Sequence, residues 1–245
     1  GRASILPDAN GYRMWYSGYR NGWRIQTASS TDGIAWERPA QNTALLPGPE
    51  RWDSVEIFSP RVVKVAADGG AILHMWYTGW DQGPAYRIGH AISLDDGATW
   101  TKSGANPVLD VGPVGAWDSR SVQGAAVLQE ANGEFRMWYM GQAGAQWQIG
   151  MATSPDGDAW TRYAGNPVMS PDPASPWESS HLFWLHVIQG GPGYQMWYSG
   201  AADASGLGQI RIGYAESTDG VNWNRDAQNP VSIPKPAGWW GNSDS

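Results

Sequence analysis

The stretch MWYTG at Met75–Gly79 occurs four times in this chain with small changes, and this repetition restricts the fold more than any other feature. The four copies begin at Met14, Met75, Met137 and Met196. Neighbouring starts lie 61, 62 and 59 residues apart, and 63 residues lead from Met196 through the two chain ends back to Met14. A fixed period of this kind is typical of repeat architectures. We therefore interpret the 245 residues as four copies of one unit.

Each unit contains four segments of strand length. In the second unit they are residues 55–65, 72–78, 86–93 and 99–102, which are rich in β-branched and aromatic residues and bounded by turn formers. No segment has a convincing helical period. Four antiparallel strands per unit of about 60 residues, repeated around a ring, make the blade of a β-propeller. The sequence predicts an all-β fold, one propeller domain over residues 1–245 with four four-stranded blades.

The two ends of the chain are expected to close the ring. Joined head to tail, they match the Trp-Asp-Ser opening and the innermost strand of the other units. We expect residues 243–245 and 2–6 to form one split innermost strand, because closure removes an open sheet edge. The repeats then span residues 1–51 plus 239–245, 52–116, 117–176 and 177–238.

Composition excludes several classes of function. The formal net charge is −7 and the basic residues are scattered singly, so no basic stripe exists for nucleic acid. No apolar run approaches the length of a membrane span. Cysteine is absent, which excludes disulfides and Cys-ligated metal. The sequence does not indicate the cellular compartment or the oligomeric state. The chain has 17 Trp and only 3 Phe, and Trp suits partly solvent-exposed positions better than a fully buried core.

The repeated motifs resemble those of a known superfamily. The pattern of MWYSG, then RIGYAESTDG at Arg211–Gly220, then NPV and a Trp-Asp/Glu-Ser opening is similar to the propellers of glycoside hydrolase families 43 and 32. The turn around Asp96 also resembles the Asp-box of sialidase-type propellers. The resemblance covers essentially the whole chain. Its motifs are specific for the propeller fold and much less so for the reaction, for which the resemblance implies glycosidase chemistry.

The resemblance does not carry the catalytic residues over. Those glycosidases have five blades, and their acids lie on inner strands, often as Asp-Pro. The matching pairs here are not acidic; they are Gly1-Arg2, Ser59-Pro60, Gly124-Ala125 and Phe183-Trp184.

The starts of the innermost strands differ among the copies, which frees them to serve a ligand. Side chains that alternate along these strands are expected to face the axis. Glycoside hydrolysis needs two carboxyl groups, and we assign them to Glu56 and Asp244. Arg120, His181 and, deeper, Gln123 are expected to bind substrate. Two alternatives stay open: a self-neutralising ion cluster that plugs the channel, and an axial metal ion on Glu56, His181 and Asp244.

Aromatic side chains supply a second set of candidates. The opening tryptophan recurs in the copies, so we expect it to pack between blades, and the acid after it to accept backbone N–H groups. Four aromatic residues lack such a structural reason and are expected to face a sugar: Phe58, Trp80, Trp147 and Trp184.

The leading hypothesis is a carbohydrate-active propeller that hydrolyses a glycosidic bond in an oligosaccharide or small-molecule ligand, with no cofactor apart from the metal ion left open above. One alternative is a propeller that binds carbohydrate or protein without turnover. Another is a propeller recruited to non-glycosidic chemistry on an apolar small molecule, which the aromatic pair at Phe183-Trp184 favours.

Overall fold

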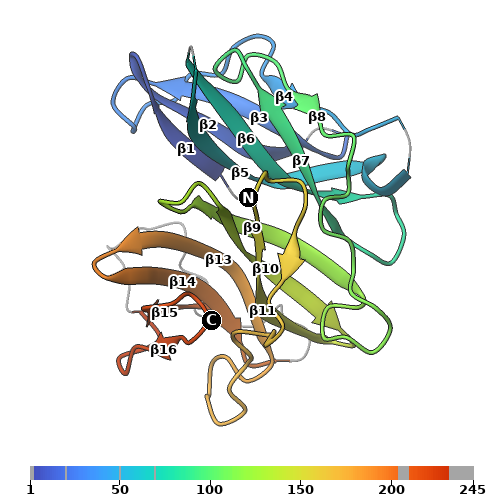
Figure 1. Cartoon of the computed structure of the whole chain (residues 1–245), viewed down its shortest axis with the longest axis vertical. Helices are drawn as coiled ribbons and strands as arrows, with labels where there is room; N and C mark the ends of the chain where they lie inside the picture. The colour runs from blue at the N-terminus through green and yellow to red at the C-terminus, as the bar shows by residue number, and fades with distance from the viewer. Residues whose placement is uncertain (1–2, 20, 50, 69, 204–209, 232–245) are drawn as a thin grey trace, which may run out of the picture.

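The chain is described by a computed structural model that covers residues 3–19, 21–49, 51–68, 70–203 and 210–231. It folds into four four-stranded antiparallel sheets arranged as a four-bladed propeller (Figure 1). Each sheet is built from four consecutive strands, so that each repeat makes one blade. The predicted all-β class and the four-bladed architecture are therefore confirmed.

The blades are numbered I to IV along the chain. Blade I comprises β1 (Ala3–Asp8), β2 (Gly11–Tyr19), β3 (Trp23–Ser30) and β4 (Thr43–Leu45). Blade II follows a short 3-10 helix, η1 (Arg51–Asp53), and comprises β5 (Glu56–Ala67), β6 (Gly70–Trp80), β7 (Arg87–Ser93) and β8 (Thr101–Lys102). Blade III comprises β9 (Ser121–Gln129), β10 (Phe135–Ala143), β11 (Gln146–Ser154) and β12 (Thr161–Arg162). Blade IV comprises β13 (His181–Gly190), β14 (Gly193–Ala201), β15 (Arg211–Ser217) and β16 (Asn224–Arg225).

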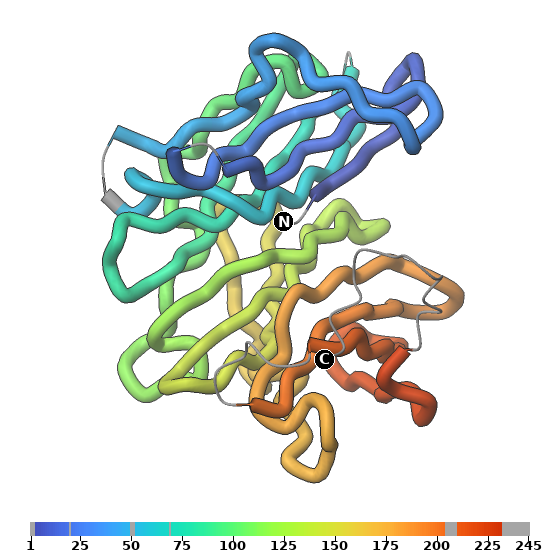
Figure 2. Tube along the Cα trace, turned by 180° about the vertical axis from the view of Figure 1, so that it is seen from behind, coloured from blue at the N-terminus to red at the C-terminus, as the bar shows by residue number. Residues whose placement is uncertain are grey.

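The hydrophobic core lies between consecutive blades. Three buried clusters join blade I to II, II to III and III to IV, and Figure 2 shows the same succession of sheets from behind. The tryptophan of the repeated motif is central to each cluster. Trp76 and Trp138 are fully buried, and their Nε1–H groups donate to the carbonyl oxygens of Gly157 (3.0 Å) and Gly220 (2.7 Å) in the next blade.

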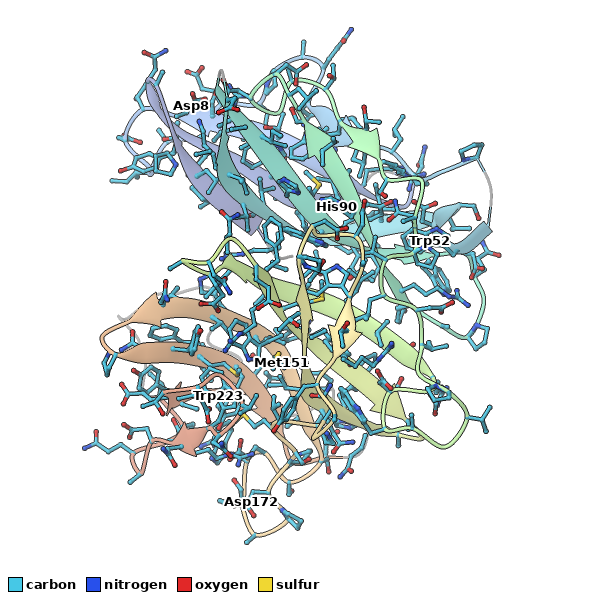
Figure 3. All side chains as sticks on the ribbon, in the orientation of Figure 1. Asp8, Trp52, His90, Met151, Asp172 and Trp223 are labelled. Atoms are coloured by element: carbon cyan, nitrogen blue, oxygen red, sulfur yellow. The ribbon has the colours of Figure 1, made fainter. Side chains whose placement is uncertain are left out.

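The tryptophan that follows the Asp-Gly turn of the next blade completes this contact for Trp76 and Trp138. Trp160 meets Trp76 edge-on at 6.0 Å between ring centroids, and Trp223, labelled in Figure 3, meets Trp138 at the same distance. Burial of aromatic surface in this geometry stabilises the junction between neighbouring blades.

The opening tryptophans are structural, but their ring contacts lie within their own blade, where the sequence expected packing between blades. Trp52 stacks on Tyr77 at 5.7 Å and crosses Gly79 and Gly89 so closely that a Cβ on either glycine would lie 2.4 Å from its ring. The acid after it has other partners than predicted. Asp53 accepts hydrogen bonds from the Tyr77 hydroxyl (3.1 Å) and from one backbone N–H, that of Gly48, and it forms an ion pair with Lys102. Asp118 and Glu178 make the matching ion pairs with Arg162 and Arg225.

The ring-closing strand stays a prediction. It comprises residues 243–245 and 2–6; residues 243–245 and residue 2 lie outside the described residues, although residues 3–8 do form the expected first strand. Within the described ranges, no buried cluster joins blade IV to blade I.

Candidate functional site

A cavity of about 500 Å³ lies where the four blades meet. Its lining residues come from all four blades: Ser17, Trp23, Glu56, Phe58, Ser59, Tyr86, Gln123, Gly124, Met140 and Trp184. Four of the residues that the sequence proposed are among them, namely Glu56, Phe58, Gln123 and Trp184. The cavity is mostly apolar with a few convergent polar groups, as small-molecule sites usually are. We call it the axial pocket.

Three β-bulges bring the innermost strands into the axial pocket. The pairing of β5, β9 and β13 with their neighbours shifts register at Phe58/Arg61, near Gln123, and at Phe183/His186. At each bulge one residue adopts a positive φ: Ser59 (53°), Gly124 (65°) and Trp184 (45°). Bulges re-aim side chains and are common beside functional sites. Ser59 and Gly124 are the positions that the resemblance matched to the glycosidase acids, whereas in blade IV the bulge lies at Trp184, one residue after the matched Phe183.

Each bulge is held by the preceding blade. The backbone N–H of Ser59 donates to Ser17 Oγ (2.8 Å), and that of Gly124 donates to Thr78 Oγ1 (3.1 Å). The third bulge departs from this pattern, because the Trp184 N–H donates to the Met140 sulfur at 3.3 Å. The residue directly after the MWY motif therefore fixes the pocket lining.

Glu56 is the one carboxylate among the described lining residues. It begins β5, is half-buried, and accepts a long hydrogen bond from the Trp23 backbone N–H at 3.4 Å. Burial, together with the negative charge of Glu56, raises the pKa of the Tyr86 hydroxyl. Tyr86 is therefore a neutral donor beside a carboxylate, an arrangement that can hold a polar ligand.

One wall of the axial pocket is aromatic. Tyr86 packs edge-on against Phe58 at 5.6 Å, and Trp80 lies behind Tyr86 with ring centroids 6.0 Å apart. Trp80 does not line the cavity; its Nε1–H donates to the Gly83 carbonyl at 2.8 Å. The structure therefore places Trp80 as a support for Tyr86, where the sequence expected it to face the ligand.

Arg120, His181 and Trp147 also lie outside the pocket lining. The exposed Arg120 donates to the Gly144 carbonyl at 2.9 Å. His181 is buried, stacks on Phe183 at 5.2 Å, and accepts the Trp147 backbone N–H at 3.4 Å. The expected convergence of Arg120 and His181 on the axis is not seen, because both side chains bind other parts of blades III and IV.

The remaining predictions about the site concern Asp244 and a metal ion. Asp244 lies outside the described residues. Within the described ranges, no group of three or more His, Cys, Asp or Glu side chains is placed to hold a metal ion. No described helix is long and apolar enough to span a membrane.

Six lining residues were not among the proposed site residues: Ser17, Trp23, Ser59, Tyr86, Gly124 and Met140. Of these, Trp23 and Tyr86 lie in segments expected as loops at the mouth of the channel, and Met140 carried a further signal. The residue after the MWY motif is Ser17, Thr78, Met140 or Ser199, so a comparison of the second strands would have marked Met140 as the divergent copy.

Several solved structures have a similar fold. A thermostable family-43 glycoside hydrolase matches with a TM-score of 0.70 at 21% identity, over 94% of this chain and 73% of that one. A family 117 glycoside hydrolase of the marine bacterium Zobellia galactanivorans matches with a TM-score of 0.70 at 16% identity, over 91% and 67%. A further glycoside hydrolase matches with a TM-score of 0.74 at 21% identity, over 96% and 75%.

Sequence relatives exist as well. Two uncharacterized proteins from two strains of Mycobacterium tuberculosis are 30% identical over 165 residues, which cover 64% of this chain. The match takes in 54% of each relative, so this chain spans about half of their length. The sequence model of the glycosyl hydrolases family 32 N-terminal domain matches residues 11–191, which include every lining residue of the axial pocket. The chain therefore belongs to the family of the glycosyl hydrolase family 32 N-terminal domain.

Proposed function

We propose that this chain is a glycoside hydrolase-like enzyme that binds one sugar unit of an oligosaccharide in the axial pocket. The observation that carries the proposal is the pocket itself, in which one carboxylate and several aromatic side chains meet at the axis of a glycosyl hydrolase-family propeller. Sugar rings have an apolar C–H face that stacks on aromatic rings and a polar edge that needs hydrogen bonds. Phe58, Trp23 and Trp184 supply the first kind of contact, and Gln123 and Ser59 supply the second.

Glu56 is the proposed carboxyl group on the described side of the pocket. Hydrolysis needs a second one about 5–5.5 Å away for retention of configuration, or about 6.5–9.5 Å away for inversion. We propose Asp244 for this role, because it follows its opening tryptophan by the same four residues that separate Trp52 from Glu56. The Tyr86 hydroxyl beside Glu56 is placed to orient the substrate.

Replacement of Glu56 by Gln tests this proposal. In a panel of nitrophenyl glycosides and oligosaccharides, Glu56→Gln should lower turnover of the preferred substrate by about 100-fold or more, since a positioned acid or base contributes at least this much. Its affinity for the sugar should change little. Asp244→Asn should have the same effect, and Glu37→Gln, which removes an exposed carboxylate outside the pocket, should have none. Full activity of Glu56→Gln would disprove its catalytic role.

Sugar binding without turnover is the second candidate. It is favoured by the presence of a single carboxylate among the described lining residues. In this case the wild-type protein binds a sugar and hydrolyses none, and Glu56→Gln reduces affinity at most a few-fold. Titration calorimetry on the whole panel, followed by product analysis, separates the two functions.

A further inference from the structure

The axial pocket has two chemically different sides. Between blades I and II the lining carries the polar groups of Ser17, Ser59 and Glu56 beside the aromatic rings of Trp23, Phe58 and Tyr86. Met140 and Trp184 form an apolar side between blades III and IV. The two sides are built by the same device, the bulge of one blade held by the second strand of the blade before it. The difference between them therefore comes from side chains at equivalent positions.

Met140 stands where the other blades carry a hydroxyl group. The equivalent residues are Ser17, Thr78 and Ser199. Those of blades I and II accept a bulge N–H at 2.8 and 3.1 Å, whereas the Met140 sulfur accepts one at 3.3 Å. A thioether is a weak acceptor and an adaptable apolar group. Met140 therefore makes the floor of the pocket apolar at this corner.

Trp184 stands where the other bulges carry Ser59 and Gly124. Its φ of 45° is unusual for a bulky side chain, and strained backbone of this kind tends to occur at functional sites. The Trp184 side chain is 53% exposed although its neighbour Leu185 is buried. Phe183 supports it at a ring distance of 5.7 Å. The structure thus holds a large apolar surface open towards the pocket at the expense of local strain.

We propose that the Met140–Trp184 corner holds a methyl carbon of the bound sugar, so that the pocket selects 6-deoxy sugars over their parent hexoses. This inference rests on the proposed sugar-binding function of the axial pocket. A methyl group on this corner gains apolar contact with the sulfur and the indole ring. A hydroxymethyl group there loses hydrogen bonds to water and meets a sulfur that already accepts the Trp184 N–H.

Matched pairs of sugars test the selectivity. L-fucose and L-galactose differ only in the hydroxyl on carbon 6, as do L-rhamnose and L-mannose. Titration of the wild-type chain with the methyl glycosides should show preference for the deoxy member of at least one pair by about tenfold, the discrimination that one small group usually gives in an apolar pocket. Met140→Thr introduces the hydroxyl of blade II and should reduce the preference to within about twofold. Glu37→Gln, which changes an exposed residue outside the pocket, should leave the preference unchanged.

Trp184→Gly provides a second variant that does not depend on the folding of Met140→Thr. Glycine adopts a positive φ readily, so this variant should melt no lower than the wild type while losing affinity for both members of the preferred pair. Equal affinity for the two members, preference for the hexose, or binding of other sugars alone would overturn the methyl site and leave the proposed function intact. Failure of every sugar to bind would overturn the proposed function itself.

Discussion

The junction between blades II and III and the junction between blades III and IV share a core and differ at its edge. In both, a buried tryptophan donates to the glycine carbonyl of the next blade and meets a second tryptophan edge-on. The residue two positions before that tryptophan differs. It is His74 at the II–III junction and Arg136 at the III–IV junction.

At the II–III junction the groups beside the buried tryptophan form a chain of titratable side chains. The Nδ1 atom of His74 lies 3.0 Å from His90 Nε2, and His90 Nδ1 lies 2.7 Å from an Asp158 carboxylate oxygen. Each donor has an acceptor when His90 donates to Asp158 and His74 donates to His90, with both imidazoles neutral. His90, labelled in Figure 3, is 2% exposed and stacks on Trp76 at 5.0 Å.

At the III–IV junction the residue beside the buried tryptophan is an arginine, which stays positively charged. Arg136 lies 3.2 Å from Glu130 through its Nε, donates to the Asp219 carbonyl at 2.6 Å, and covers the Tyr194 ring at 5.1 Å. Tyr194 donates to Glu130 at 2.7 Å, and burial with this hydrogen bond raises its pKa to about 12. The comparison teaches that the tryptophan contact defines the junction, whereas the flanking residue decides whether the junction responds to pH.

Acid should therefore loosen the II–III junction first. Burial, and then the neighbouring His90, lower the pKa of His74 to about 4, and burial lowers that of His90. Below pH 6.5 the unfolded chain takes up protons that these folded histidines refuse, so the free energy of unfolding should fall between pH 6.5 and about 4. Because His74 is partly exposed, we expect its share to be about 2 kcal/mol.

Urea unfolding at several pH values between 7 and 4.5 measures this loss. His74→Gln, which introduces the residue that blade IV carries at this position, should make the dependence on pH shallower. Arg136→Gln should lower stability at every pH and keep the wild-type slope. An unchanged slope in His74→Gln would remove the histidines from the explanation.

Removal of the Arg136 cation at the III–IV junction should lower the free energy of unfolding slightly less than protonation of His74 does at the II–III junction. Arg136→Ala breaks a partly buried ion pair, a hydrogen bond and a ring contact, and leaves Glu130 with one partner fewer, so we expect a loss of about 1.5 kcal/mol. Arg13 holds the equivalent position in blade I, but its ion pair with Asp8 is more exposed. Arg13→Ala should therefore cost about 0.5 kcal/mol. Equal losses in the two variants, measured by denaturant unfolding at pH 7, would contradict the role assigned to burial.

The repeat period was enough to predict the strands and the blades. These features recur because each blade must bury the same face against the next one. The flanking residues could not be assigned in this way, since the pair of His74 and His90 meets Asp158 only after two blades have packed, through His90.

The site was predictable in part for a related reason. Glu56 and Gln123 were found because the innermost strands diverge among the copies, and Phe58 and Trp184 because they are aromatic residues that do not recur in every copy. Beyond the bulge, the alternation of side chains along the strand no longer predicts which residues face the axis, because each bulge inserts an extra residue. Met140 and Tyr86 were missed because they lie outside the innermost strands.

The junction between blades I and II offers the smallest and sharpest test of the shared core. Trp15 is buried and meets Trp100 edge-on at 5.9 Å, but its Nε1–H has no partner within the described ranges. The reason lies in the turn of blade II, where Gly97 follows Ser93 by four residues, whereas Gly220 follows Ser217 by three. Trp15→Phe and Trp138→Phe remove the same atoms, yet only the second loses a hydrogen bond. We expect Trp15→Phe to be the milder change by about 1 kcal/mol in denaturant unfolding, and equal losses would mean that the bond from Trp138 to Gly220 adds nothing to the junction.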